Sequence, residues 1–152
     1  GDTAERETLE RATLATHVLC QEARRAGVER LIVASTLKVF DAYPERLLID
    51  EAWKPRPAPT VEHLAPYLCE QVAREFAREG GINGICLRFL PLGDDPERNT
   101  RLGDAVHAIE CALALPFTPS GYRWHVFHIA SSPRYLMREA TKLLGFKPEG
   151  ER

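Results

Sequence analysis

The chain has 152 residues, of which 44% are hydrophobic and 28% are charged, and its formal net charge at pH 7 is −2. The near balance of 20 Lys and Arg against 22 Asp and Glu excludes a strongly basic nucleic-acid-binding surface and an acidic tail. The length suffices for one domain, over residues 1–152, but a complete dinucleotide-binding fold with a substrate domain needs roughly twice as much, since domains run to about 100–200 residues each.

The cysteines and the apolar stretches predict the compartment. Cys20, Cys69, Cys86 and Cys111 lie far apart with no Cys-x-x-Cys pair, so no zinc site is expected. Such free thiols are typical of a reducing cytoplasm. No stretch approaches the roughly 18 apolar residues of a membrane span, and the N-terminus has no signal-like pattern. We therefore expect a cytoplasmic protein without metal, nucleic-acid or membrane partners.

The first half of the chain predicts helix, strand, loop and helix. Residues 4–26 contain no Gly or Pro and end before a glycine, which predicts a long helix. Residues 30–36 form an apolar, β-branched run typical of a strand buried on both faces. Residues 41–60 hold four prolines and predict a long loop of the kind that often carries function. Pro66 suits the first position of the next helix, 66–79.

The second half continues the alternation. It predicts a strand at 84–89, a helix at 103–115 with Asp104 near its start as N-cap, a strand at 124–130 and a helix at 133–144. Alternating strands and helices indicate an α/β fold with a parallel sheet and right-handed crossovers. The strand at 30–36 has the composition of a central strand, yet nothing before it in the sequence can pair with it.

Ligands of open parallel sheets gather at the carboxyl ends of the strands. Here those ends are Ser35 and Thr36, residues 89–93, and Ser131 and Ser132. The five histidines are expected to be structural or surface residues, because the two on the last strand, His125 and His128, point to opposite faces.

Several segments resemble a known family. Residues 33–40, VASTLKVF, are similar to the "ASS-x-x-VYG" turn of the extended short-chain dehydrogenase/reductases, the NAD-dependent epimerase/dehydratase group. Further segments resemble other motifs of this family, in the family's order over about residues 8–148. Residues 23–30 resemble "A-x-x-x-GVKR", residues 65–71 resemble "SPYxxSK", residues 102–106 resemble "V-x-D-x-A" and residues 125–130 resemble "x-x-YNIG". The resemblance implies a partial Rossmann-like parallel sheet of about three strands with flanking helices, without the N-terminal βαβ half that binds the dinucleotide.

The resemblance also implies site residues. The family's Ser/Thr that hydrogen-bonds the substrate hydroxyl corresponds to Thr36, with Ser35 beside it, and its catalytic tyrosine to Tyr67. A phenol with an ordinary pKa of about 10 needs a nearby positive charge to act as a base at neutral pH. The family supplies a lysine one helical turn later, but this chain has Gln71. Lys38 and Lys54 are alternatives in the loop that no spacing places beside Tyr67.

The resemblance implies NAD or NADP as cofactor. The family's "RFxNVYGP" segment corresponds to residues 88–93, where Pro91 replaces the Asn and Leu92 follows, and these two are the candidate cofactor contacts. The phosphate-binding GxxGxxG is absent from the sequence. Gly80 and Gly81 follow a predicted helix and are typical of a helix stop.

Two hypotheses remain open. The first is an NAD(P)-dependent epimerase/dehydratase or reductase acting on a sugar nucleotide or a small hydroxy or keto compound, inactive as this chain alone and completed by a missing N-terminal half or a partner chain. The second is a non-catalytic relative that serves dimerisation or partner binding. The family's helix pairing implies a homodimer through helices 4–26 and 66–79 under either hypothesis.

Overall fold

The computed structural model describes residues 2–117, 121 and 123–152. The elements in chain order are α1 (Asp2–Arg25), β1 (Arg30–Thr36), the 3₁₀ helix η1 (Leu37–Phe40), α2 (Val61–Glu79), β2 (Asn83–Phe89), α3 (Leu102–Ala114), β3 (Trp124–Ile129) and the short π-helix η2 (Ala140–Leu144). The predicted alternation of helices and strands is confirmed. None of the helices in these described ranges is long and apolar enough to cross a membrane.

The three strands form one parallel sheet in the order β1-β2-β3. Val33 pairs with Cys86 in the centre of the sheet, and Cys86 pairs with Val126. β1 therefore lies at an edge of the sheet, although its residues Leu31, Ile32 and Val33 have the composition of a central strand. This is the arrangement expected from a strand with no earlier partner in the sequence.

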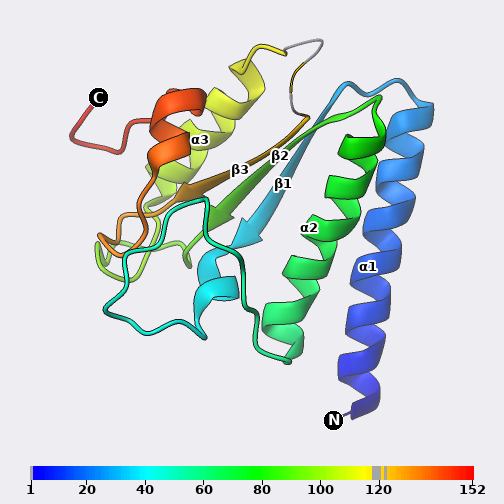
Figure 1. Ribbon diagram of the computed structural model, residues 1–152, viewed down its shortest axis with the longest axis horizontal. Coiled ribbons are helices and arrows are strands. Elements are labelled where there is room, and N and C mark those ends of the chain that lie inside the picture. Colours follow the sequence, from blue (N-terminus) through cyan, green and yellow to red (C-terminus); the bar gives the residue numbers. More distant parts are fainter. Residues whose placement is uncertain (1, 118–120, 122) are drawn as a thin grey trace.

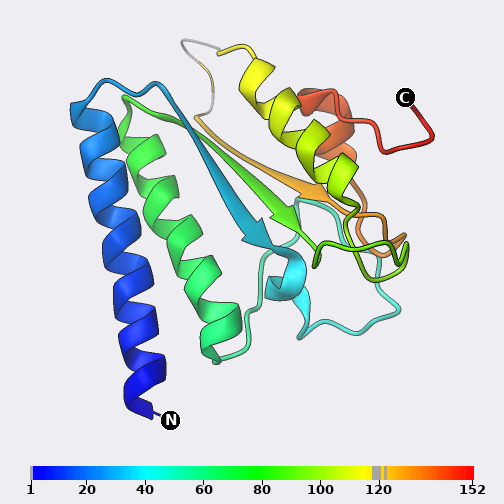
Figure 2. The same ribbon diagram turned by 180° about the vertical axis from the view of Figure 1, so that it is seen from behind.

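Helices cover both faces of the sheet (Figures 1 and 2). On one face, α1 and α2 pack as a pair, and their residues Cys20, Ala73 and Ala77 form a core with Cys86 and Trp124. On the other face, α3 and η2 pack over the sheet around a larger core. Its fully buried members include Ile85, Leu87, Ala108, Ala112, Phe127, Ile129 and Phe146.

The two crossovers have opposite hands. The connection from β1 to β2 passes through α2, and the connection from β2 to β3 passes through α3. Both connections step in the same direction along the sheet, but they cross opposite faces. The expectation of right-handed crossovers throughout is therefore wrong at one of the two. The fold departs here from a rule that holds for the great majority of parallel connections.

The start of α2 also differs from the prediction. The helix begins at Val61, and Pro66 lies inside it. The backbone carbonyl of Thr60 accepts hydrogen bonds from the N–H groups of His63 and Leu64, at 3.1 and 2.8 Å, so the first turn is closed before the proline is reached. Pro66, the sixth residue of α2, has no N–H with which to continue this pattern, so the helix lacks one backbone hydrogen bond at this point.

The last predicted helix, 133–144, is shorter in the structure. Tyr135 forms a bridge to Ile49 in the long loop, because the N–H of Ile49 donates to the carbonyl of Arg134 at 2.9 Å and the N–H of Leu136 donates to the carbonyl of Ile49 at 2.8 Å. These backbone groups are thereby withdrawn from a helix. η2 starts only at Ala140, whose N–H donates to the carboxylate of Glu51 at 3.1 Å.

Candidate functional site

A buried ion pair lies near the carboxyl end of the sheet, on the face covered by α2. Glu70 on α2 accepts two hydrogen bonds from Arg88 on β2, from Nε to Oε1 at 3.0 Å and from Nη2 to Oε2 at 2.6 Å. The two side chains are 1% and 5% exposed. Ser35, which pairs with Arg88 across the strands, donates its hydroxyl to Glu70 Oε1 at 2.5 Å. A bidentate guanidinium–carboxylate contact of this kind fixes the geometry of both partners.

The charges of this pair compensate one another. Burial by itself would lower the pKa of Arg88, but the hydrogen bonds and the negative charge of Glu70 outweigh that effect and raise the pKa. The neighbouring thiol of Cys86 is fully buried, and burial together with the charge of Glu70 raises its pKa well above the ordinary value. Cys86 is therefore a neutral, unreactive thiol at physiological pH.

Tyr67 and Gln71 lie one turn apart on α2 and line the same cavity, which has a volume of about 350 Å³. Glu70 and Arg88 form part of its wall, and Lys54 reaches it from the long loop. The structure thus brings Tyr67 and the glutamine at the family's lysine position together, as the family motif implies. The cavity also receives a lysine from a part of the chain where no sequence spacing predicted it.

Thr36 and Ser35 are both engaged within the protein. The Thr36 hydroxyl accepts a hydrogen bond from the backbone N–H of Lys38 at 3.2 Å and caps η1. The Ser35 hydroxyl is directed at Glu70. Within the described part of the chain, no hydrogen bond joins Thr36 to Tyr67, and neither Ser35 nor Thr36 belongs to the wall of the cavity around Tyr67.

Pro91 and Leu92 lie just beyond the carboxyl end of β2, and both are exposed. The carbonyl of Pro91 accepts hydrogen bonds from the backbone of Thr100 and the side chain of Asn99, each at 3.0 Å. This carbonyl therefore serves the turn that leads to α3. The side chains of the two candidate cofactor contacts remain accessible at the strand end.

Three residues around the cavity were not predicted from the sequence: Glu51, Glu70 and Arg88. Lys54 was considered only as an alternative cation in the loop, and the structure places it in the cavity wall. The Glu51 carboxylate accepts hydrogen bonds from the backbone N–H groups of Arg138 and Ala140, both at 3.1 Å, and so caps the last helix. No local sequence pattern predicts this contact, because more than 80 residues separate Glu51 from these two partners. Arg88 did give a signal, because a charged residue inside a buried apolar strand requires a partner.

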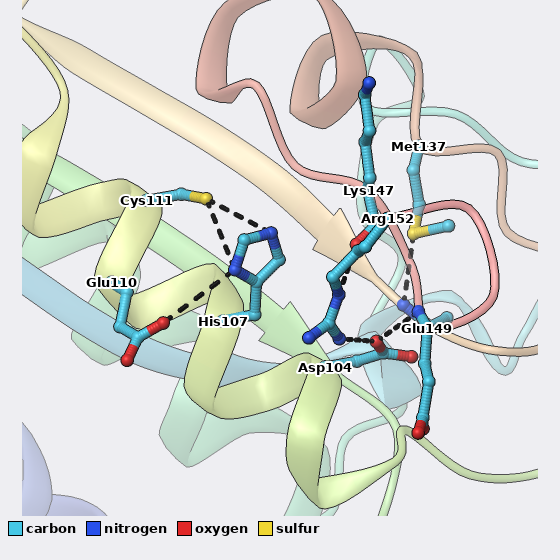
Figure 3. Close-up of polar contacts among 9 residues, drawn as sticks. Asp104, His107, Glu110, Cys111, Met137, Lys147, Glu149 and Arg152 are labelled. Atoms are coloured by element: carbon cyan, nitrogen blue, oxygen red, sulfur yellow. Dashed lines mark hydrogen bonds and ion pairs between the residues drawn. The ribbon is translucent and has the colours of Figure 1, made fainter.

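A second polar cluster lies on the α3 side of the sheet (Figure 3). Asp104 is 2% exposed and accepts hydrogen bonds from Arg152 Nη2 at 2.5 Å and from the backbone N–H of Glu149 at 2.7 Å. The N-cap of α3 is Arg101, so the expected capping role of Asp104 is wrong. Asp104 instead holds the C-terminal segment against the start of α3, which is a structural role.

His107 and Cys111 are neighbours on α3, with Nε2 and Sγ 3.7 Å apart (Figure 3). Burial and the charge of Glu110 raise the pKa of the Cys111 thiol, which keeps it protonated. Among the described residues, no group of three or more His, Cys, Asp or Glu side chains is arranged to hold a metal ion.

A family model describes most of this chain. The model of the NAD dependent epimerase/dehydratase family matches residues 2–110. The chain belongs to this family. A comparison with curated proteins gives no match.

Solved structures share the family fold. MoeE5 in complex with UDP-glucuronic acid and NAD is 20% identical, with a TM-score of 0.73 over 90% of this chain and 65% of its own. Glucuronic acid dehydrogenase from Chromohalobacter salexigens is 19% identical, with a TM-score of 0.73 over 90% of this chain and 52% of its own. UDP-glucuronic acid 4-epimerase from Bacillus cereus is 14% identical, with a TM-score of 0.71 over 90% of this chain and 62% of its own. At these identities the likeness shows the fold, and this chain spans about half to two thirds of each neighbour.

The residues of this chain do not by themselves fit a nicotinamide dinucleotide. Gly80 and Gly81 adopt positive φ angles of 102° and 91° directly after α2, so they end a helix and do not open one onto a phosphate. At the family's lysine position Gln71 offers an amide, which can hydrogen-bond a ribose hydroxyl but carries no charge. A dinucleotide site on this family member needs residues that these 152 do not contain.

Proposed function

We propose that this chain forms the C-terminal half of an NAD(P)-dependent epimerase/dehydratase or reductase that acts on a sugar nucleotide or a small hydroxy or keto compound, and that it is inactive alone. The observation that carries this proposal is the position of β1. An apolar strand with the composition of a sheet centre lies at the edge, with one side unpaired within the described residues. A missing N-terminal half or a partner chain would supply the neighbouring strand and the dinucleotide site.

Within this proposal, the side chains of this half orient the substrate. Thr36 would hydrogen-bond a substrate hydroxyl or carbonyl, with Ser35 holding the end of β1 through Glu70. Tyr67 would exchange a proton with the same oxygen. Gln71 would hydrogen-bond the ligand but carries no charge with which to stabilise a phenolate, so proton transfer is expected to be slow compared with a lysine-containing site.

The test is to restore the charge in the assembled protein. When the N-terminal half is supplied, Gln71→Lys should raise epimerase or reductase activity by about two orders of magnitude, the lower end of a general acid–base contribution. Gln21→Lys, which changes a residue of α1 away from the cavity around Tyr67, is the matched control and should leave activity unchanged. No gain in the Gln71→Lys protein would contradict the enzyme proposal.

The alternative is a non-catalytic member of the family that serves dimerisation or partner binding. Gln71 and the engagement of the Ser35 hydroxyl by Glu70 favour it, because both remove features that the family's chemistry uses. The homodimer expected under either proposal would form through α1 and α2. In support, α1 exposes Leu14, Val18 and Leu19, which are 64%, 46% and 61% accessible. We also place the protein in the cytoplasm, on the ground that its four cysteines are free thiols.

A further inference from the structure

The cavity beside Tyr67 extends along α2 away from the strand ends. Its wall is built from three parts of the chain: residues 51 and 53–55 of the long loop, residues 67, 70, 71 and 74 of α2, and the sheet residues Arg88, Trp124 and Val126. Trp124 is the first residue of β3, so the cavity reaches the opposite end of that strand from the predicted catalytic site. Both tryptophans of the sequence contribute to it, together with the ring of Tyr67.

The loop side of the cavity is held in place by Tyr43. The Tyr43 hydroxyl donates to the backbone carbonyl of Lys54 at 2.9 Å, and its ring contacts the ring of Trp53 edge-to-face at 5.1 Å. The N–H of Arg56 donates to the carbonyl of Val39 at 2.9 Å. The Trp53 and Lys54 wall is therefore a formed part of the structure, which reduces the entropic cost of binding a ligand there.

The charges that line the cavity do not cancel. Glu70 and Arg88 neutralise each other. Glu51 accepts backbone hydrogen bonds but keeps its negative charge, so the charged residues that line the cavity leave one net positive charge. Arg74 shares the single carboxylate of Glu75 with Arg78. No ion pair between described residues involves Lys54, whose side chain lines the cavity. One net positive charge therefore remains next to the aromatic rings, and Lys54 is the lining cation without an ion-pair partner among the described residues.

We propose that this cavity binds a small planar aromatic anion, a ring that carries one phosphate or carboxylate group. The ring would lie against Trp53 and Tyr67, the anionic group would contact Lys54 with Arg74 behind it, and Gln71 would donate a hydrogen bond. The volume of about 350 Å³ is at the lower end of ligand cavities and suits one small ring system. The proposal shares Tyr67 and Gln71 with the proposed catalytic site, but it does not require catalysis, because binding to this chain alone is what the experiment measures.

The two tryptophans report binding directly. In a ¹H–¹⁵N spectrum of this chain, the indole N–H signals of Trp53 and Trp124 should shift saturably when phenyl phosphate or benzoate is added. Phenol and benzamide lack the charge, and inorganic phosphate and acetate lack the ring. Each of these four compounds should therefore bind at least about tenfold more weakly than the charged aromatic probes. The comparison of phenyl phosphate with benzoate decides which anionic group the cavity prefers.

Substitution of the cations tests the assignment. Lys54→Met should weaken the binding of the preferred probe about tenfold, and Arg74→Met should weaken it by a smaller factor. Arg78→Met removes an exposed cation that also pairs with Glu75 but does not line the cavity, and it should leave binding unchanged. Unchanged affinity in Lys54→Met, equal binding of phenol and phenyl phosphate, or no indole shift up to about 10 mM of either charged probe would overturn the proposal.

Discussion

The two faces of the sheet use their polar side chains in different ways. The face under α2 carries Glu70, Arg88 and His128 within or against the sheet, all buried. The face under α3 is filled by aliphatic and aromatic side chains, and its buried carboxylate, Asp104, lies at the start of the helix and holds the C-terminal segment. One face therefore provides mainly apolar packing, whereas the other also buries the Glu70–Arg88 pair, which contacts Ser35 and lines the same cavity as Tyr67 and Gln71.

The largest expected effect comes from breaking the ion pair on the α2 face. Glu70→Ala leaves the guanidinium of Arg88 buried without its partner, which should lower the free energy of unfolding by about 3–5 kcal/mol. Glu75→Ala removes a carboxylate of the same helix that pairs at the surface, and it should cost far less because water screens that pair. Urea denaturation of both proteins measures the difference, and equal losses would contradict the account of this face.

His128, which is buried on the α2 face, should make the free energy of unfolding depend on pH. Burial, with the charge of Arg88 in addition, lowers the pKa of His128 from 6.5 to about 3. Between these values the unfolded chain binds a proton that the folded chain does not. The stability contributed by neutral His128 is therefore complete above about pH 6.5 and falls by about 1.4 kcal/mol per pH unit as the pH decreases.

Substitution of this histidine tests the pH dependence. His128→Gln should reduce the slope of unfolding free energy against pH between about pH 6 and 4, whatever its effect on absolute stability. His17→Gln changes a histidine at the surface of α1 and should leave the slope as it is. The idea is refuted if the two variants have the same pH dependence as the parent.

The space around two glycines differs: Gly84 is closely packed on the α2 face, whereas Gly103 on α3 has open space around it. A Cβ at Gly84 would lie 2.5 Å from Trp124 Cε3 and 3.2 Å from Ala77 Cβ, so Gly84→Ala should destabilise the protein by about 1–3 kcal/mol. Nothing lies within 4 Å of a Cβ at Gly103, and Gly103→Ala should stabilise the helix by about 0.5–1 kcal/mol. Thermal unfolding measures both changes, and a stabilising Gly84→Ala would show that the approach of Trp124 is not as close as described.

The outer surface of the α1–α2 pair should govern association with little effect on the fold. Leu14→Glu places a charge on the exposed apolar side of α1, so it should convert a dimer into a monomer while changing unfolding free energy by no more than about 0.5 kcal/mol. Light scattering after size exclusion gives the mass. A parent protein that is already monomeric at all concentrations would contradict the dimer proposal.

The sequence predicts the order and nature of most elements because each has its own local pattern, such as the apolar run at 30–36 or the glycine after α1. It does not predict that α2 and α3 cross opposite faces, because hydrophobic periodicity says which side of a helix is buried but not against which face of the sheet. The late start of the last helix could not be predicted for a related reason. The backbone before and at its start forms hydrogen bonds with the backbone of Ile49 and the carboxylate of Glu51, which are far away in the chain.

The candidate site was predictable in part. Tyr67 and Gln71 lie together in one cavity because their spacing on a helix requires it. The places of Lys54 and Glu70 could not be derived in this way. The position of Lys54 depends on the path of a loop rich in proline. The pairing of Glu70 depends on Arg88, which the parallel pairing of β1 and β2 places next to Ser35.

The most direct test of the central claim is a calorimetric titration of this chain alone with NAD⁺ and with NADP⁺. This chain has the family fold, and we expect it to have no dinucleotide site of its own. Neither cofactor should therefore bind saturably at micromolar concentrations. A dissociation constant in the micromolar range for this chain alone would contradict this expectation.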